Sequence, residues 1–172
     1  RGGPRIVDAT TYYLEARAIS GGQLAWPEGD PSEVGRFLVR DGRGHVAGIF
    51  PPGYPAVLAI GFWLGVPMAI GPCLAFGVTW ATAALARAAL ARDAAVSDSV
   101  TRVAVLLSVA CGALRYHTAD TMSHGLAALC AAVGLACAFR LRERPRGREA
   151  LAAGAALGLL VAARPFSGAA LA

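Results

Sequence analysis

The stretch YPAVLAIGFWLGVPMAIGPCLAFGVTWATAALA, residues 54–86, decides the fold of this chain because it contains no Asp, Glu, Lys or Arg. An uncharged, apolar run of about 18 residues or more is typical of a membrane-spanning helix. The whole chain of 172 residues has a mean hydropathy of +0.52 and only 16% charged residues, whereas a soluble domain has about a quarter. The sequence therefore predicts an all-α, polytopic membrane protein.

Glycine and proline divide this apolar stretch. The tripeptide Gly65–Pro67 is the expected break, since proline is well placed in the first turn of a helix. Gly71-Pro72 is the competing position. Residues 54–64 are then too short to cross a bilayer and are expected at its interface. The predicted spans lie at about 67–91, 97–115, 119–139 and 149–163.

The arginines predict the orientation of these spans. All sixteen basic residues are arginine, and five of them lie in RLRERPRGR, residues 140–148. Cytoplasmic loops carry the excess of positive charge, so 140–148 and 87–102 are expected on the cytoplasmic side of the membrane. The segments expected on the outer face are 1–54, 115–124 and 164–168. An outer N-terminal segment also predicts a span upstream, in a longer protein. Because the arginines cluster beside the spans, the net charge of +5 indicates a membrane and not a nucleic acid as the partner.

Residues 1–54 are predicted to form an extracytoplasmic loop, followed by a transmembrane region over 55–172. Within the loop, DATTYYLEARAISGG (8–22) predicts a short amphipathic helix. Asp8 is a suitable N-cap and Gly21 a suitable C-terminal stop. Glu15 is expected to be a solvated helix residue. The following segment is rich in Gly, Pro and Asp, so 21–47 is expected to be loop.

The predicted topology gathers several polar residues on the outer face. Ionisable groups near a membrane are costly and are candidates for function. Asp8, either a helix cap or a general base, has Tyr12 one turn further along the helix, so that both can face one cavity. Arg164 is either a snorkelling anchor or a ligand for a phosphate. Arg115 and His124 are further candidates for polar contacts.

A metal site is considered for His117, Asp120 and His124, which are spaced as on one face of a helix. Zinc needs three or four well-placed ligands, and no third segment clearly supplies them, so no metal site is predicted. A divalent cation stays an open alternative that the sequence does not indicate. Polar lining of a site is the preferred interpretation of these residues. The cysteines lack CxxC spacing and are expected to be small buried side chains: Cys73, Cys111, Cys130 and Cys137.

Four segments, in this order, resemble the N-terminal half of the bacterial GT-C glycosyltransferases. They are VDATTYYLEARAISGG (7–22), GIFPPGYPAVLAIGFWLGVP (48–67), TMSHGLAAL (121–129) and ALAAGAALGLLVAARPFSG (150–168). The resemblance is strongest to the branch that is similar to protein O-mannosyltransferases and lipid A aminoarabinose transferases. It covers nearly the whole chain.

This resemblance implies a multi-span enzyme that moves a sugar from a polyprenyl-phosphate carrier to a lipid, glycan or protein acceptor outside the cell, usually with inversion. The catalytic acidic residue in the first outer loop matches Asp8. Many relatives have Asp-Glu there, whereas this chain has Asp8-Ala9. Our hypothesis for this mechanism has Asp8 as the general base or as the group that orients the acceptor. Arg164 contacts the carrier phosphate, with Arg115 as a further candidate, and His124 and Tyr12 give polar support.

Two other functions fit the same residues. A transporter or flippase for lipid-linked sugars would also have polar residues in a membrane cavity. Such proteins often contain repeated, broken helices, and a single break is visible here. The other alternative is a non-catalytic membrane scaffold, in which the polar residues of the outer face would be scattered and replaceable.

Overall fold

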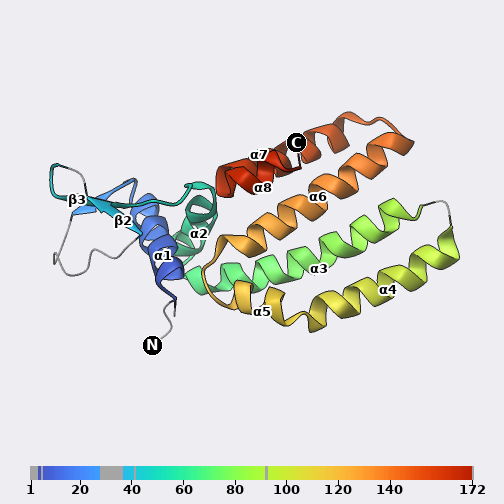
Figure 1. Cartoon of the computed structure of the whole chain (residues 1–172), viewed down its shortest axis with the longest axis horizontal. Helices are drawn as coiled ribbons and strands as arrows, with labels where there is room; N and C mark the ends of the chain where they lie inside the picture. Colours follow the sequence, from blue (N-terminus) through green and yellow to red (C-terminus); the bar gives the residue numbers. More distant parts are fainter. Residues whose placement is uncertain (1–3, 5, 28–36, 41, 92, 172) are drawn as a thin grey trace.

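The computed structural model describes residue 4 and residues 6–27, 37–40, 42–91 and 93–171. Over these residues the chain is mostly helical (Figure 1). A 3-10 turn at Pro67–Ala69 leads directly into α3. The elements are α1 (Val7–Ser20), β1 (Trp26–Pro27), β2 (Leu38–Arg40), β3 (His45–Gly48), α2 (Gly53–Trp63), α3 (Ile70–Ala89), α4 (Ala94–Ala110), α5 (Gly112–Ala119), α6 (Ser123–Glu143), α7 (Gly147–Ala163) and α8 (Pro165–Ala169).

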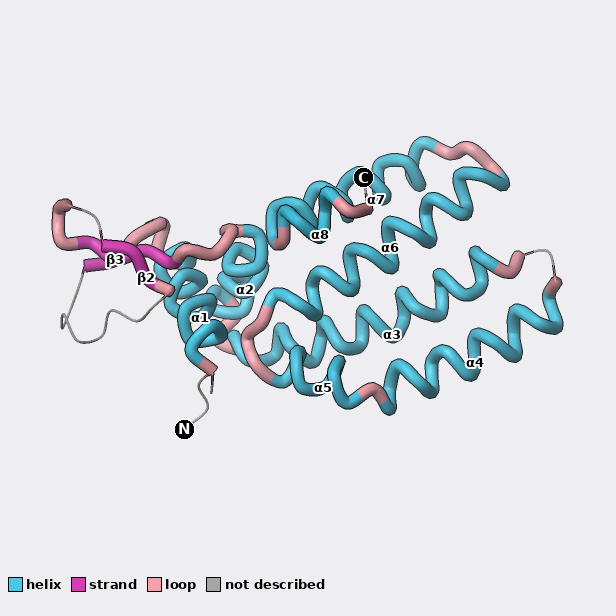
Figure 2. Tube along the Cα trace, viewed as in Figure 1, coloured by secondary structure: helices cyan, strands magenta, loops and turns pink. Residues whose placement is uncertain are grey.

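Four long helices lie side by side in the order α4, α3, α6, α7 (Figures 1 and 2). The α3–α4 and α6–α7 connections lie at one end of this bundle. At the other end lie α1, α2, the small sheet, the α5–α6 turn and the start of α8. The arginine-rich segment 140–148 therefore lies at the opposite end from α1, as the predicted topology requires.

Among the described residues, two helices are long and apolar enough to cross a membrane, Pro67–Ala89 and Ser123–Glu143. A third candidate is the pair α4 and α5, which is bent by 51° at its break. The span predicted at 97–115 is therefore two helices, separated at Cys111. The span predicted at 149–163 is α7, whose 17 residues are fewer than the roughly 20 that a span needs. Cys73 and Cys111 are exposed, so the expectation that all four cysteines are buried is wrong.

The break in the long apolar stretch is confirmed at Gly65. This residue has a φ of 75°, which glycine adopts without steric cost, and it separates α2 from the turn at Pro67. The competing break at Gly71-Pro72 is wrong, because α3 runs without interruption from Ile70. A proline in the first helical turn removes no intrahelical hydrogen bond.

Helix α1 is confirmed, but its beginning differs from the prediction. Ile6 is the N-cap, and Asp8 lies inside the first turn. There it adds negative charge near the positive end of the helix dipole. Gly21 is the C-cap, and its N–H donates to the carbonyls of Arg17 and Ala18.

The expectation that residues 21–47 form only loop is wrong. Three short antiparallel strands form a sheet in the order β1, β3, β2, with Trp26 opposite Val46 and Leu38 opposite Gly48. The described strands have two to four residues, too few to show the alternation of polar and apolar residues that identifies a strand. The expectation that Glu15 is solvated is also wrong, because its side chain is buried between α1 and β3.

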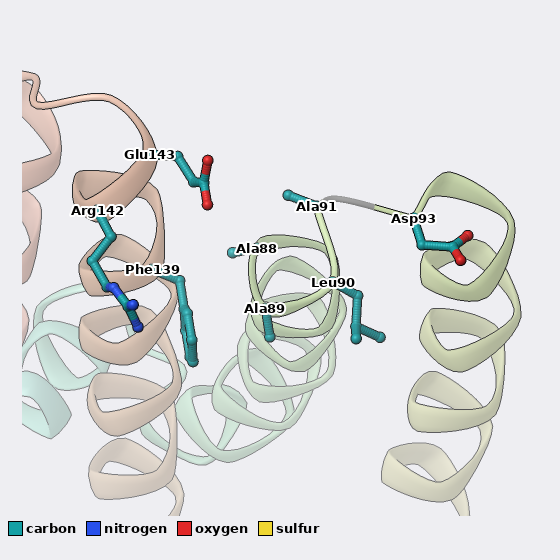
Figure 3. A pocket seen from close by; sticks show the side chains of 8 residues that line it. All are labelled: Ala88, Ala89, Leu90, Ala91, Asp93, Phe139, Arg142 and Glu143. Carbon is teal, nitrogen blue, oxygen red and sulfur yellow. The ribbon is translucent and has the colours of Figure 1, made fainter.

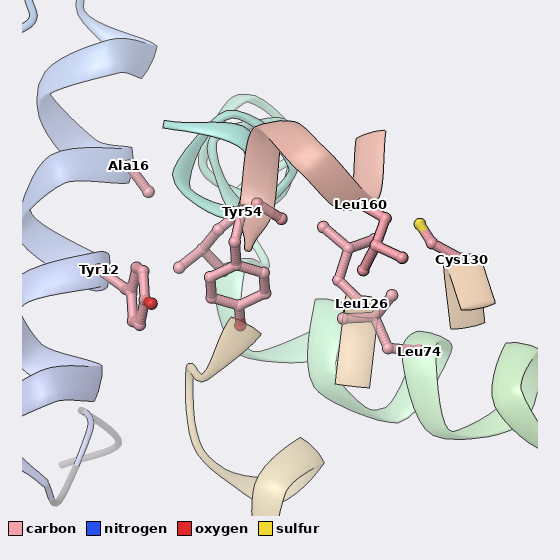
Figure 4. Close-up of a cluster of buried hydrophobic side chains, with 9 residues drawn as sticks. Tyr12, Ala16, Tyr54, Leu74, Leu126, Cys130 and Leu160 are labelled. Atoms are coloured by element: carbon pink, nitrogen blue, oxygen red, sulfur yellow. The ribbon is translucent and has the colours of Figure 1, made fainter. Parts of the chain in front are cut away.

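The core lies where α1 and α2 meet the bundle of long helices. Tyr12 of α1 and Tyr54 and Leu58 of α2 are buried with side chains of the long helices (Figure 4). The long helices contribute Leu74, Leu126, Cys130 and Leu160. This cluster therefore fixes α1 and α2 against the ends of α3, α6 and α7.

Candidate functional site

A cavity of about 420 Å³ lies at the α1 end of the bundle. Four separate segments line it: the first turns of α1, the chain after β3, the start of α6 and the α7–α8 junction. Of the five residues predicted from the sequence, Asp8, Tyr12, His124 and Arg164 line this cavity together. Arg115 is an exposed residue of α5 and is not among the lining residues.

Two long-range hydrogen bonds position α1. The Tyr12 hydroxyl and Ser123 Oγ share a buried hydrogen bond of 3.1 Å. Thr121 Oγ1 donates a bond of 2.7 Å to the carbonyl of Ala9. Both bonds join the first turns of α1 to the start of α6. Because Asp8 directly precedes Ala9 and lies one turn before Tyr12, these bonds also hold the backbone of Asp8 beside the cavity.

The ring of Tyr12 forms an aromatic wall of the cavity. It stacks on Phe50, with ring centroids 4.5 Å apart, and meets Tyr54 edge-on at 5.2 Å. Burial raises the pKa of Tyr12 above its usual value of 10.0, although the bond to Ser123 and the charge of Arg164 oppose this rise. Tyr12 is therefore a neutral phenol near pH 7. It serves as a wall and a hydrogen-bonding group, and it has no role as a base.

Arg164 lies at the junction of two helices. Its N–H donates to the carbonyl of Leu160 at 2.7 Å, at the end of α7, and its own carbonyl accepts from the N–H of Gly168 at 3.0 Å. Pro165 then begins α8. The backbone of Arg164 is thus held from both sides, and the half-buried side chain lines the cavity. A guanidinium in this position can bind a phosphate through two parallel hydrogen bonds.

His124 lies in the first turn of α6 and contacts a second histidine. The ring of His117 in α5 stacks on it, with centroids 4.3 Å apart and an angle of 20° between the planes. The expectation that His117, Asp120 and His124 share one helix face is wrong, because α5 ends at Ala119 and Asp120 lies in the turn before α6. No three His, Cys, Asp or Glu side chains among the described residues are arranged to hold a metal ion.

Several lining residues were missed by the sequence reasoning. Ser123, which pairs with Tyr12, lies 111 positions further along the chain, so no local pattern connects them. Phe50 and Pro51 come from the segment between β3 and α2, and Phe166 comes from α8. The one available signal for Ser123 was its place beside His124 at the beginning of a hydrophobic helix.

A further cavity, of about 290 Å³, lies at the arginine-rich end of the bundle (Figure 3). Arg142 and Glu143 of α6 face the end of α3, and Asp93 lies at the start of α4. None of the residues predicted as site residues lines it. The candidate site is therefore the cavity at the α1 end.

Comparison with known proteins adds no assignment to this site. No family model matches the sequence, and no curated protein or solved structure is significantly similar to it. The chemistry of the cavity therefore rests on the residues that line it.

Proposed function

We propose that this chain belongs to a membrane glycosyltransferase. The enzyme would move a sugar from a polyprenyl-phosphate carrier to a lipid, glycan or protein acceptor at the outer face of a bacterial inner membrane. One observation carries the proposal: Asp8 and Arg164, a carboxylate and a guanidinium from opposite ends of the chain, line the same cavity with Tyr12 and His124.

The reaction needs two charged groups in different positions. In an inverting transfer, the acceptor hydroxyl attacks the anomeric carbon from the face opposite the leaving phosphate. The bond to the acceptor oxygen forms as the bond to the phosphate oxygen breaks, and the phosphate keeps the electron pair. Asp8 takes the proton of the hydroxyl, and Arg164 stabilises the charge that develops on the phosphate. These two residues come from different walls of the cavity, α1 and the α7–α8 junction.

The place of the cavity fits a membrane donor. A polyprenyl phosphate keeps its chain in the bilayer and its phosphate at the surface. The cavity lies at one end of a bundle with two or three helices long enough to cross a membrane. The arginine-rich loops, which are typical of the cytoplasmic side, lie at the other end. Because Arg115 does not line the cavity, it has no role in this proposal.

The test uses the full-length protein in proteoliposomes with polyprenyl-phosphate-linked sugars extracted from the host membrane. Release of free polyprenyl phosphate measures the transfer. Asp8→Asn keeps the shape of the side chain but removes the base, so the rate is expected to fall by about 10²–10⁴-fold. Asp98→Asn, on the exposed side of α4, is the matched control and keeps the wild-type rate.

A wild-type rate for Asp8→Asn would contradict the assignment of Asp8 as the base. If the wild type and Asp8→Asn both carry lipid-linked sugar across the vesicle membrane without cleaving it, the protein is a flippase and the proposal of transfer is wrong.

A further inference from the structure

A small cavity, of about 190 Å³, lies at the arginine-rich end of the bundle, between the end of α3, the end of α6 and the start of α7. It adjoins the cavity of Figure 3, with which it shares Ala88, Ala91 and Glu143. Apart from the two alanines, every lining residue is charged, and both signs are present. The charged lining residues are Arg140, Glu143, Arg144, Arg146 and Glu149.

Glu149 supplies a buried carboxylate to this cavity. It lies in the first turn of α7 and is only 8% exposed. Its Oε1 accepts a hydrogen bond of 3.3 Å from Nε of Arg148 and lies 3.9 Å from Nη1 of Arg146. Its Oε2 is buried and has no hydrogen-bond partner among the described residues. Because a buried acceptor without a partner is costly and uncommon, this oxygen indicates a donor from a ligand in the cavity.

Two arginines bring positive charge from either side of the α6–α7 turn. Arg140 lies in the last turn of α6, and Arg146 is the N-cap of α7. Guanidinium groups bind a phosphate through parallel hydrogen bonds. The contact between Arg146 and Glu149 places one such group beside the buried carboxylate. A ligand with a phosphate and a nearby cationic donor would therefore match both sides of the cavity.

The position and size of the cavity limit the ligand further. Both α3 and α6 belong to helices that are long and apolar enough to cross a membrane, so their ends lie at the level of the lipid headgroups. Basic pockets between membrane helices bind such headgroups. A volume of about 190 Å³ is below the roughly 300–1,000 Å³ that drug-sized ligands occupy. The cavity therefore suits a small headgroup and not a nucleotide.

We propose that this cavity binds the phosphoethanolamine headgroup of a membrane phospholipid, with its phosphate between Arg140 and Arg146 and its ammonium on Glu149. A primary ammonium has three N–H donors, whereas the trimethylammonium of choline has none. A phosphoglycerol headgroup has hydroxyl donors but lacks the positive charge that attracts the carboxylate. The site lies at the opposite end of the bundle from Asp8 and does not depend on the proposed transfer of a sugar.

The test measures lipid binding to the full-length protein, purified in detergent and stripped of lipid. Native mass spectrometry follows the first lipid bound in titrations with phosphatidylethanolamine, phosphatidylcholine and phosphatidylglycerol that carry the same acyl chains. The Kd for phosphatidylethanolamine should be about tenfold lower than that for phosphatidylcholine, because choline cannot donate the hydrogen bond to a charged acceptor. Soluble glycerophosphoethanolamine should displace the lipid, and glycerophosphocholine should not.

Two variants separate the two halves of the headgroup. Glu149→Gln removes the negative charge, so it should abolish the preference for ethanolamine over choline and leave the Kd for phosphatidylcholine unchanged within about twofold. Arg140→Gln removes a contact to the phosphate that all three lipids share, so it should weaken every lipid by a similar factor. Asp98→Asn and Arg87→Gln are the matched controls, at exposed positions that line neither cavity at this end, and both should bind as the wild type does.

Three outcomes would overturn the inference. Equal Kd values for the ethanolamine and choline lipids would mean that the ammonium makes no specific contact. Tighter binding of phosphatidylglycerol than of phosphatidylethanolamine would mean that the arginines attract anionic lipid without the carboxylate. A Glu149→Gln protein that keeps the preference would place the headgroup elsewhere.

The displacement by glycerophosphoethanolamine needs no variant, so it tests the site even if Glu149→Gln does not fold. Asp8→Asn should bind phosphatidylethanolamine as the wild type does. A failure of the lipid site is therefore distinct from a failure of the proposed transfer, which Asp8→Asn tests by its rate.

Discussion

The carboxylate of Glu15 in α1 lies against the backbone of Gly48 in β3, where any Cβ atom at position 48 would collide with it. Glu15 is only 7% exposed, and its Oε2 has no hydrogen-bond partner among the described residues. Burial raises the pKa of Glu15 to about 7. This acid joins the helix that carries Asp8 to the strand that leads into the cavity wall.

The buried Glu15 predicts that stability falls as the pH rises. Its pKa increases from 4.5 to about 7 on folding, so the folded state holds a proton that the unfolded state has lost between these values. Stability is then greatest below pH 4.5, declines up to about pH 7 and stays at the lower level above. At about 1.4 kcal/mol per pKa unit, the loss is a few kcal/mol.

Glu15→Gln removes this dependence, because the amide does not ionise. In thermal unfolding of the full-length protein in detergent, the variant should be more stable than the wild type at pH 8 and similar to it at pH 4. Parallel pH profiles of the two proteins would contradict the raised pKa of Glu15.

The bond between Tyr12 and Ser123 should stabilise the docking of α1. Tyr12→Phe leaves the buried Ser123 hydroxyl without its partner, which costs about 1–3 kcal/mol in free energy of unfolding. The double variant Tyr12→Phe/Ser123→Ala removes both polar groups and should cost less than the sum of the two single changes. A double-mutant cycle by denaturant unfolding measures the difference. Strict additivity would mean that the two hydroxyls do not interact.

Gly53 is required where α2 meets the end of α7. A Cβ atom there would lie 2.6 Å from the amide nitrogen of Ala163 and 2.7 Å from the carbonyl oxygen of Ala162. Backbone atoms cannot move aside as a flexible side chain can, so Gly53→Ala should destabilise the fold by about 1–3 kcal/mol or more.

Gly158→Ala is the matched control for Gly53→Ala. A Cβ atom at Gly158 meets nothing within 4 Å, and alanine favours a helix by up to about 1 kcal/mol over glycine. In thermal unfolding, Gly53→Ala should therefore lower the Tm, whereas Gly158→Ala should raise it slightly. Equal effects would show that α2 does not approach α7 so closely.

Arg164→Lys should weaken the binding of the lipid-linked sugar donor while preserving the positive charge. A lysine ammonium cannot make the two parallel hydrogen bonds of a guanidinium, so the expected loss in kcat/KM for the lipid-linked donor is about tenfold, or about 1.4 kcal/mol. Arg144→Lys, at the other end of the bundle, should leave kcat/KM unchanged. A wild-type value for Arg164→Lys would remove this residue from the phosphate site.

Local sequence predicted the elements better than their contacts. The uncharged stretch 54–86 contains both α2 and α3, and Gly65 marks the break between them, because hydropathy and backbone conformation are local properties. The sheet was missed because strands of two to four residues have no recognisable period. The burial of Glu15 depends on Gly48, and the place of Tyr12 depends on Ser123. Such pairs are far apart in sequence and become neighbours through packing.

The residues that line the cavity are far apart along the chain, so the order of their synthesis sets when the cavity can assemble. Asp8 is translated before the α7–α8 junction, which lines the same cavity up to Ser167. At roughly 5–20 residues per second, synthesis of the intervening chain takes on the order of ten to thirty seconds. The hydrogen-bond partners of α1 become available once Thr121 and Ser123 have been made, and the cavity is complete only after α7 and the start of α8 have followed. Any activity that needs this cavity can begin only after the α7–α8 junction has been made.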